Sequence, residues 1–273
     1  MVSLKTAARV ALILALPMTA LAETPQTVNA SLRVDQGQDV PDDATRIAQA
    51  RDWIVGIISK AAPPGRKVLF PEGQETPEGA LARYRSIADD LIQVIYDPST
   101  PPLFRDANGR ARTVSVVLGI MLHESGFMRQ VDFGLGKAGL GDHGKSFCSL
   151  QLKVGKDRTI KWNTKYNRPP KWNDPKDEIF NGYTGKELVA NRRLCISEGL
   201  KLMRISFGGT QGLPLEDRLR IYASGNRDDG ADKSHSRMRT AMKFFDSTAK
   251  ERTFKDADII KAVKKTAFVG PSS

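Results

Sequence analysis

The feature that most constrains this chain is an apolar run from Val114 to Leu122 that leads directly into the polar sequence His-Glu-Ser-Gly at residues 123–126. Its larger apolar side chains recur at the i, i+3, i+4 spacing of one helix face: Val114, Val117, Leu118, Met121 and Leu122. Gly126 is a plausible helix stop signal. The sequence therefore predicts a helix packed in a core, with Glu124 in its last turn.

Glu124 has an unusual place for a solvated glutamate. The helix dipole puts partial negative charge at the C-terminal end, which disfavours a carboxylate there. Burial also disfavours the charged form. Both effects favour the protonated acid, which is the form that a general acid needs near neutral pH. We therefore take Glu124 as the candidate catalytic acid.

Further segments extend this pattern. In chain order the pieces are Glu124-Ser125, Gly141-Asp142-x-Gly144-x-x-Phe147, Leu150-Gln151-Leu152 and Ile221-Tyr222-Ala223-Ser224-Gly225. This order resembles the goose-type lysozymes and lytic transglycosylases of the lysozyme-like superfamily. In that group a Glu-Ser pair ends a buried helix, two later turns close a sugar cleft, and an Ala-Tyr-Asn-Ala-Gly segment follows.

The resemblance implies a mainly α, α+β lysozyme-like fold with a small β or loop region around the cleft. It also implies cleavage of the bond between N-acetylmuramic acid and N-acetylglucosamine, with Glu124 as the acid and Tyr222 hydrogen-bonded to the acid or to the sugar. Hydrolysis with inversion needs a second carboxylate as base. Asp142 is the first candidate for that base and Asp132 the second.

Two departures from the family pattern bear on the reaction. Lys153 stands where goose-type lysozymes carry an aspartate, which favours the transglycosylase reaction slightly, because there the 6-hydroxyl of the muramic acid attacks its own anomeric carbon. Ala223 replaces the usual asparagine after Tyr222. These departures keep open a second hypothesis, a non-catalytic peptidoglycan-binding or scaffold protein with a degenerate lysozyme-like fold.

Several residues are candidates for binding the glycan strand. They are Ser125, Ser146, Gln151, Trp162 and Trp172. Flat aromatic rings at a cleft rim stack on the apolar face of a sugar. An equally good interpretation is that the two tryptophans only anchor a long loop, which we expect over residues 153–183.

The remaining organisation follows from composition and periodicity. We expect a signal peptide at 1–22, a flexible leader at 23–42, an N-terminal helical extension at 43–110, a catalytic domain at 111–250 and a C-terminal tail at 251–273. Helices are predicted at 43–61, 78–96, 184–207, 215–223 and 234–248. A capping box of Thr184 and Glu187 begins the third of these.

The signal peptide places the mature chain in the periplasm or outside the cell, as a protein with no transmembrane segment. In an oxidising compartment Cys148 and Cys195 most simply form a disulfide, and two buried free thiols are the alternative. The three histidines and two cysteines lack the spacing of zinc ligands, so the chemistry calls for no metal or cofactor.

The chain is basic, with a formal net charge of +11 that becomes +9 when Lys5 and Arg9 leave with the signal peptide. A basic secreted protein meets anionic surfaces, and the expected partners are peptidoglycan strands and anionic wall polymers. Nucleic acid is disfavoured because the basic residues are dispersed among acidic ones.

Overall fold

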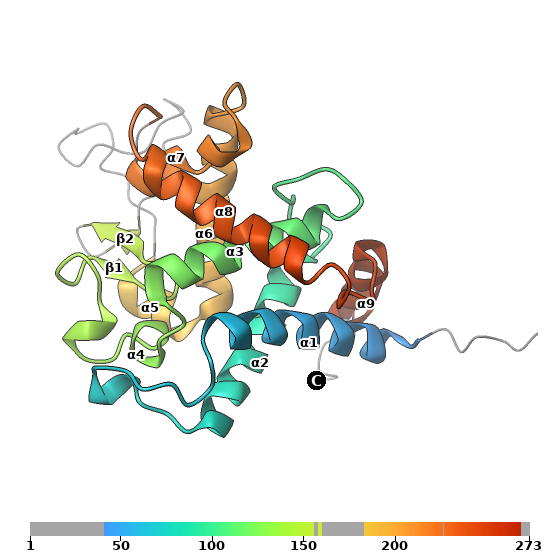
Figure 1. Ribbon diagram of the computed structural model, residues 1–273, viewed down its shortest axis with the longest axis horizontal. Helices are drawn as coiled ribbons and strands as arrows, with labels where there is room; N and C mark the ends of the chain where they lie inside the picture. The colour runs from blue at the N-terminus through green and yellow to red at the C-terminus, as the bar shows by residue number, and fades with distance from the viewer. Residues whose placement is uncertain (1–40, 156–157, 160–182, 226, 269–273) are drawn as a thin grey trace, which may run out of the picture. The chain divides into compact units, whose positions relative to one another are not determined.

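Nine helices and a small sheet make up the part of the chain that the computed structural model describes, namely residues 41–155, 158–159, 183–225 and 227–268 (Figure 1). The helices are α1 (Asp43–Ala61), α2 (Pro77–Ile95), α3 (Gly109–Ser125), α4 (Arg129–Asp132), α5 (Gly185–Ala190), α6 (Arg192–Gly209), α7 (Arg220–Ser224), α8 (Ala231–Ser247) and α9 (Asp256–Phe268). The 3-10 turns are η1 (Pro71–Gly73), η2 (Lys137–Gly139) and η4 (Leu215–Asp217). The predicted mainly helical fold class is confirmed.

The sheet is antiparallel and lies between α4 and α5 in the sequence. Its strands are β1 (Ser146–Phe147), β2 (Leu152–Gly155) and β3 (Arg158–Thr159), in the order β1-β2-β3. Ser146 pairs with Lys153, and Val154 pairs with Thr159. A small sheet was expected in this region. Among the described residues, no helix is both long and apolar enough to cross a membrane.

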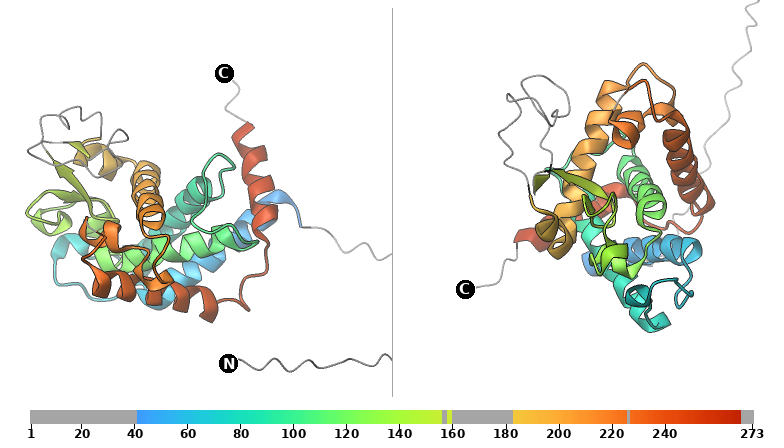
Figure 2. Two further views of the ribbon diagram at one scale, coloured as in Figure 1. Left: turned by 90° about the horizontal axis from the view of Figure 1, so that it is seen from above. Right: turned by 90° about the vertical axis from the view of Figure 1, so that its left-hand side faces the viewer.

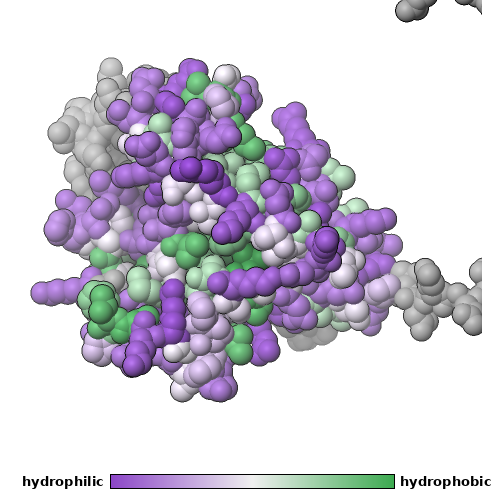
Figure 3. Space-filling model, viewed as in Figure 1, coloured by the Kyte–Doolittle hydropathy of each residue, from purple (hydrophilic) through white to green (hydrophobic). Residues whose placement is uncertain are grey.

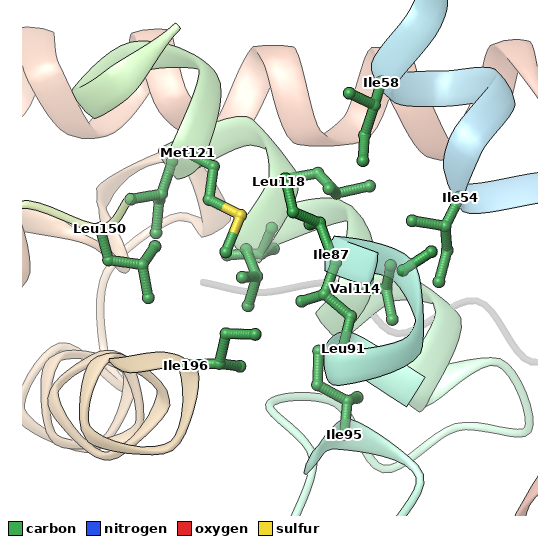
Figure 4. Close-up of a cluster of buried hydrophobic side chains, with 14 of the residues drawn as sticks. Ile54, Ile58, Ile87, Leu91, Ile95, Val114, Leu118, Met121, Leu150 and Ile196 are labelled. Atoms are coloured by element: carbon green, nitrogen blue, oxygen red, sulfur yellow. The ribbon is translucent and has the colours of Figure 1, made fainter. Parts of the chain in front are cut away.

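The core joins the N-terminal helices to the predicted catalytic region. Isoleucines and leucines of α1 and α2 meet the buried side of α3, and α6 adds Ile196 (Figure 4). The labelled members of this cluster are Ile54, Ile58, Ile87, Leu91, Ile95, Val114, Leu118, Met121, Leu150 and Ile196. Each fully buried side chain of this size contributes roughly 1.5–3 kcal/mol to folding. The extension and the region that carries Glu124 therefore share one hydrophobic core.

Helix α3 is the central element. Most of its side chains are buried, and α8 packs along it (Figures 1 and 2). Gly119 permits this close approach, because a Cβ atom there would lie 3.1 Å from both the amide nitrogen of Ala241 and the carbonyl oxygen of Arg237. The two backbones are therefore in contact, and α8 places its side chains near the C-terminal end of α3.

The start of α3 is capped by a distant aspartate. The Asp256 carboxylate accepts hydrogen bonds from the amides of Arg110 (2.8 Å) and Ala111 (3.2 Å), and from the hydroxyl of Tyr96 (3.1 Å). A carboxylate at a helix N-terminus binds free amides and complements the dipole. Burial raises the pKa of Asp256, and the two amide bonds oppose this shift.

Several predicted helices agree with the structure. α1 has the predicted bounds, and the Asp42 side chain caps it by accepting the amide of Thr45. The capping box of Thr184 and Glu187 begins α5. However, the single helix predicted at 184–207 is wrong, because the chain turns to an extended conformation at Asn191 and its side chain caps α6.

Two other predictions need correction. The helix predicted at 215–223 is divided into η4 and α7, with Leu219 between them. The expected C-terminal tail contains α9, which packs against α1 and buries Ile259 and Val263. The predicted signal peptide and leader lie outside the described residues, apart from Pro41 and Asp42 at the end of the leader.

Candidate active site

Glu124 lies in the last turn of α3, with 21% of its side chain exposed. The helix ends at Gly126, which has a left-handed conformation (φ 56°). Ser125 helps to close this end, because its hydroxyl donates to the Met121 carbonyl (2.7 Å) and accepts the amide of Phe127 (3.2 Å). Ser125 is buried and its hydroxyl is occupied by the backbone, so Glu124 is the member of the Glu-Ser pair that reaches the surface.

The Glu124 carboxylate forms an ion pair with Arg237 of α8. Arg237 Nε donates to Glu124 Oε1 over 3.0 Å, and its Nη2 donates to the same oxygen. Only 11% of the Arg237 side chain is exposed, so water screens this pair weakly. The guanidinium offsets the unfavourable charge of a carboxylate at a helix C-terminus. The two residues are 113 positions apart and share no sequence motif, so the sequence did not predict the role of Arg237.

Tyr222 approaches Glu124 from α7. Its hydroxyl donates to the carbonyl of Leu150 (3.0 Å), and its amide donates to Ser206 Oγ (3.1 Å). Burial raises the pKa of Tyr222 well above its ordinary value, the Glu124 carboxylate raises it further, and Arg237 opposes both. The phenol thus stays protonated within the electrostatic field of Glu124. The sequence predicted that Tyr222 binds Glu124 or the sugar. In the described residues its hydroxyl binds the Leu150 carbonyl and not Glu124.

The turn at residues 141–151 is held by its own side chains. Ser146 Oγ donates to Asp142 Oδ2 (2.9 Å), and Gln151 Nε2 donates to the carbonyl of Cys148 (3.1 Å). A Cβ atom at Gly141 would lie 1.9 Å from Gln151 Oε1, so a side chain there would displace this amide. Asp142 is exposed and has a positive φ of 48°. Ser146 and Gln151 bind within the turn and give it a fixed form.

A disulfide joins this turn to the helix behind it. Cys148 and Cys195 are bonded, with their Cα atoms 6.4 Å apart, which confirms the predicted pairing. Cys195 is in α6, whose Gly199 receives the side chain of Leu150, because a Cβ at Gly199 would lie 2.4 Å from Leu150 Cδ1. The disulfide and this packing fix the carbonyl that binds Tyr222.

Asp132, the second candidate for a catalytic base, belongs to a buried ion-pair network. Arg192 Nε donates to its Oδ1 (3.0 Å) and Arg192 Nη2 to its Oδ2 (2.7 Å). Both carboxylate oxygens are therefore engaged by a guanidinium. This leaves Asp142, which is exposed and accepts one hydroxyl bond, as the more accessible carboxylate of the two.

His123 precedes Glu124 and faces α8, where its Nε2 lies 3.0 Å from Thr240 Oγ1. Burial lowers the pKa of His123, Arg237 lowers it further, and Glu124 opposes them. Within the described part of the chain, no cluster of three or more histidine, cysteine or acidic side chains could hold a metal ion. Trp162 and Trp172 lie outside the described residues.

Comparison with protein-family models, curated proteins and solved structures gives no match to this chain. The site is therefore described by its geometry alone. It is a partly exposed carboxylate at a helix end, paired with an arginine, beside a buried tyrosine and a disulfide-fixed turn.

Proposed function

We propose that this protein is a secreted peptidoglycan-cleaving enzyme, a lytic transglycosylase or lysozyme-type muramidase. It acts on the bond between N-acetylmuramic acid and N-acetylglucosamine, with Glu124 as the essential acid and base. The observation that carries this proposal is the meeting of three sequence segments that are far apart. Glu124 ends α3, Tyr222 of α7 lies in its field, and the Tyr222 hydroxyl binds the disulfide-fixed turn at Leu150.

The proposed reaction needs one carboxylic acid. Glu124 protonates the glycosidic oxygen of the leaving N-acetylglucosamine as the bond to the anomeric carbon breaks. It then removes the proton of the muramic acid 6-hydroxyl as that oxygen bonds to the anomeric carbon, which gives a 1,6-anhydro sugar and restores the acid. Arg237 binds only Oε1 of Glu124, so Oε2 is the oxygen that carries the proton.

The arrangement of carboxylates favours this route over hydrolysis. Direct hydrolysis with inversion requires a second carboxylate to activate water, with the two groups roughly 6.5–9.5 Å apart. Asp132 is held by Arg192, and Lys153 is exposed in β2 at the position where goose-type lysozymes carry an aspartate. Asp142 is left as the one candidate base from the sequence that is not bound by an arginine.

The experiment is a digestion of purified wall sacculi by the mature protein, with mass spectrometry of the soluble products. We expect muropeptides that end in 1,6-anhydro sugars. Reducing ends in their place would assign hydrolysis, with Asp142 as the base to be tested. An absence of soluble glycan across pH and salt would contradict the enzyme proposal.

One observation favours the second candidate, a non-catalytic peptidoglycan-binding protein. A guanidinium that donates twice to Glu124 stabilises the ionised carboxylate, and this is not the form that protonates a leaving group. Sedimentation of the protein with sacculi separates the two functions. A protein that pellets with sacculi and releases no product is a binder, whereas release of product assigns catalysis.

A further inference from the structure

A cavity of about 820 Å³ lies apart from the residues of the candidate active site. Its walls come from α2 and the segment just before it, from both ends of α4 and from the junction of α5 and α6. A volume of this order is typical of sites for small organic ligands. None of Glu124, Arg237 and Tyr222 lines it. The junction exists because the chain leaves the helical conformation at Asn191.

An aromatic ring is exposed in the cavity. Phe133 lines the cavity and is 41% exposed, which is unusual for a side chain of this size. Most of the molecular face drawn in Figure 3 is hydrophilic. The guanidinium carbons of Arg129 and Arg192 each lie 6.0 Å from the centre of the ring. Phe133 and the neighbouring Val189 thus give an apolar surface beside positive charge.

Two of the four arginines in the cavity wall have most of their donors engaged, chiefly by carboxylates. Arg83 has 5% of its side chain exposed, and its Nε donates to Glu75 (3.1 Å). Arg192 binds Asp132 through two nitrogens and Asp90 through Nη1 (2.8 Å). These pairs fix the wall, and they use most of the donors of both guanidiniums.

The other two arginines keep donors for a ligand. Arg129 donates Nη1 to the backbone carbonyl of Glu72 (2.8 Å) and has no carboxylate in ion-pair contact among the described residues. Arg193 donates only its Nε, to Asp90 (2.8 Å), and 58% of its side chain is exposed. The wall holds four guanidiniums and two carboxylates, those of Glu75 and Asp90. Asp132 does not line the cavity, but it pairs with Arg83 and Arg192, and counting it leaves an excess of one positive charge.

We propose that this cavity binds a peptide that carries a carboxylate. Arg129 and Arg193 hold the carboxylate, and Phe133 packs against an apolar side chain of the same peptide. A single excess charge matches a monoanion, whereas the carboxylates of Glu75 and Asp90 in the wall repel a phosphate dianion. The volume exceeds what a lone carboxylate fills, and the apolar surface selects a ligand with a side chain. This site is independent of the proposed glycosidic activity.

The test compares two dipeptides that differ in one charge, acetyl-Phe-Glu-amide and acetyl-Phe-Gln-amide, by calorimetric titration of the full mature protein at low salt. We expect the glutamate peptide to bind roughly 10-fold more tightly, because a charge-assisted bidentate bond is stronger than a neutral one. Arg129→Gln should remove most of this difference. Arg105→Gln is the matched control, since Arg105 is exposed and lies outside the cavity wall.

Equal affinity for the two peptides would overturn the proposal. So would equal effects of Arg129→Gln and Arg105→Gln, or stronger binding of inorganic phosphate than of the glutamate peptide. If Arg129→Gln does not fold, as judged by circular dichroism, Arg193→Gln replaces it, because the exposed Arg193 side chain makes little contact with the core. The same loss of affinity is then expected, and unchanged affinity contradicts the site.

Discussion

Removal of the disulfide between Cys148 and Cys195 should lower the free energy of unfolding by about 4 kcal/mol. The two cysteines are 47 positions apart, so the bond closes a loop of that length in the unfolded chain. In the chain-entropy account the entropy lost by the unfolded state is about 2.1 + 1.5R ln n cal/mol/K, which for this loop corresponds to about 4 kcal/mol at room temperature. Both residues are buried, so packing makes a separate contribution.

Equilibrium unfolding in urea, with and without a thiol-free reductant, separates these contributions. The reduced wild-type protein keeps both sulfur atoms and loses only the cross-link. The double variant Cys148→Ala/Cys195→Ala also loses the sulfur atoms, so it should be less stable than the reduced protein, because buried volume is removed. A loss of less than about 1 kcal/mol on reduction would refute the loop-closure reasoning.

Two more predictions concern helix α3, which carries Glu124. Gly119→Val should lower the free energy of unfolding in urea by about 2 kcal/mol, because the added side chain overpacks against α8. Gly56→Val is the control and should lower it by less, since no atom lies within 4 Å of a Cβ added there. Burial raises the pKa of Asp256 in the folded state above the ordinary value of about 3.9. Between these two pKa values the folded state binds more protons than the unfolded state. The free energy of unfolding therefore falls as the pH rises from about 4 through the raised pKa. Asp256→Asn should remove this fall, as measured by the difference between wild-type and variant unfolding curves across that range.

The sequence was informative where local chemistry decides the structure. Asp42 has the side chain of a helix cap, and Thr184 with Glu187 forms a capping box, so the starts of α1 and α5 followed from a few neighbouring residues. The break at Asn191 did not follow, because apolar residues continue with a helical period on both sides of it. Its cause is a side-chain cap that competes with the continuous helix.

Long-range contacts were beyond the sequence patterns. α9 was predicted as a tail, since a short basic amphipathic segment gives no sign of the partner that buries Ile259. Arg237 was missed because its role depends on the packing of α8 against Gly119, far away in the chain. Glu124 could be singled out because it follows a continuous apolar run and lies just before the glycine that ends the helix.

The central claim is that Glu124 performs the chemistry, and the rate of sacculus solubilisation by Glu124→Gln tests it most directly. The variant keeps the shape of the side chain and can no longer donate and accept the proton. Glu78→Gln is the matched control, because Glu78 is exposed in the first turn of α2. General acid–base catalysis contributes typically 100- to 10,000-fold, so Glu124→Gln should lose at least about 100-fold in rate while Glu78→Gln keeps the wild-type rate. A Glu124→Gln variant that solubilises sacculi at a rate close to that of Glu78→Gln would contradict the assignment of the active site to the end of α3.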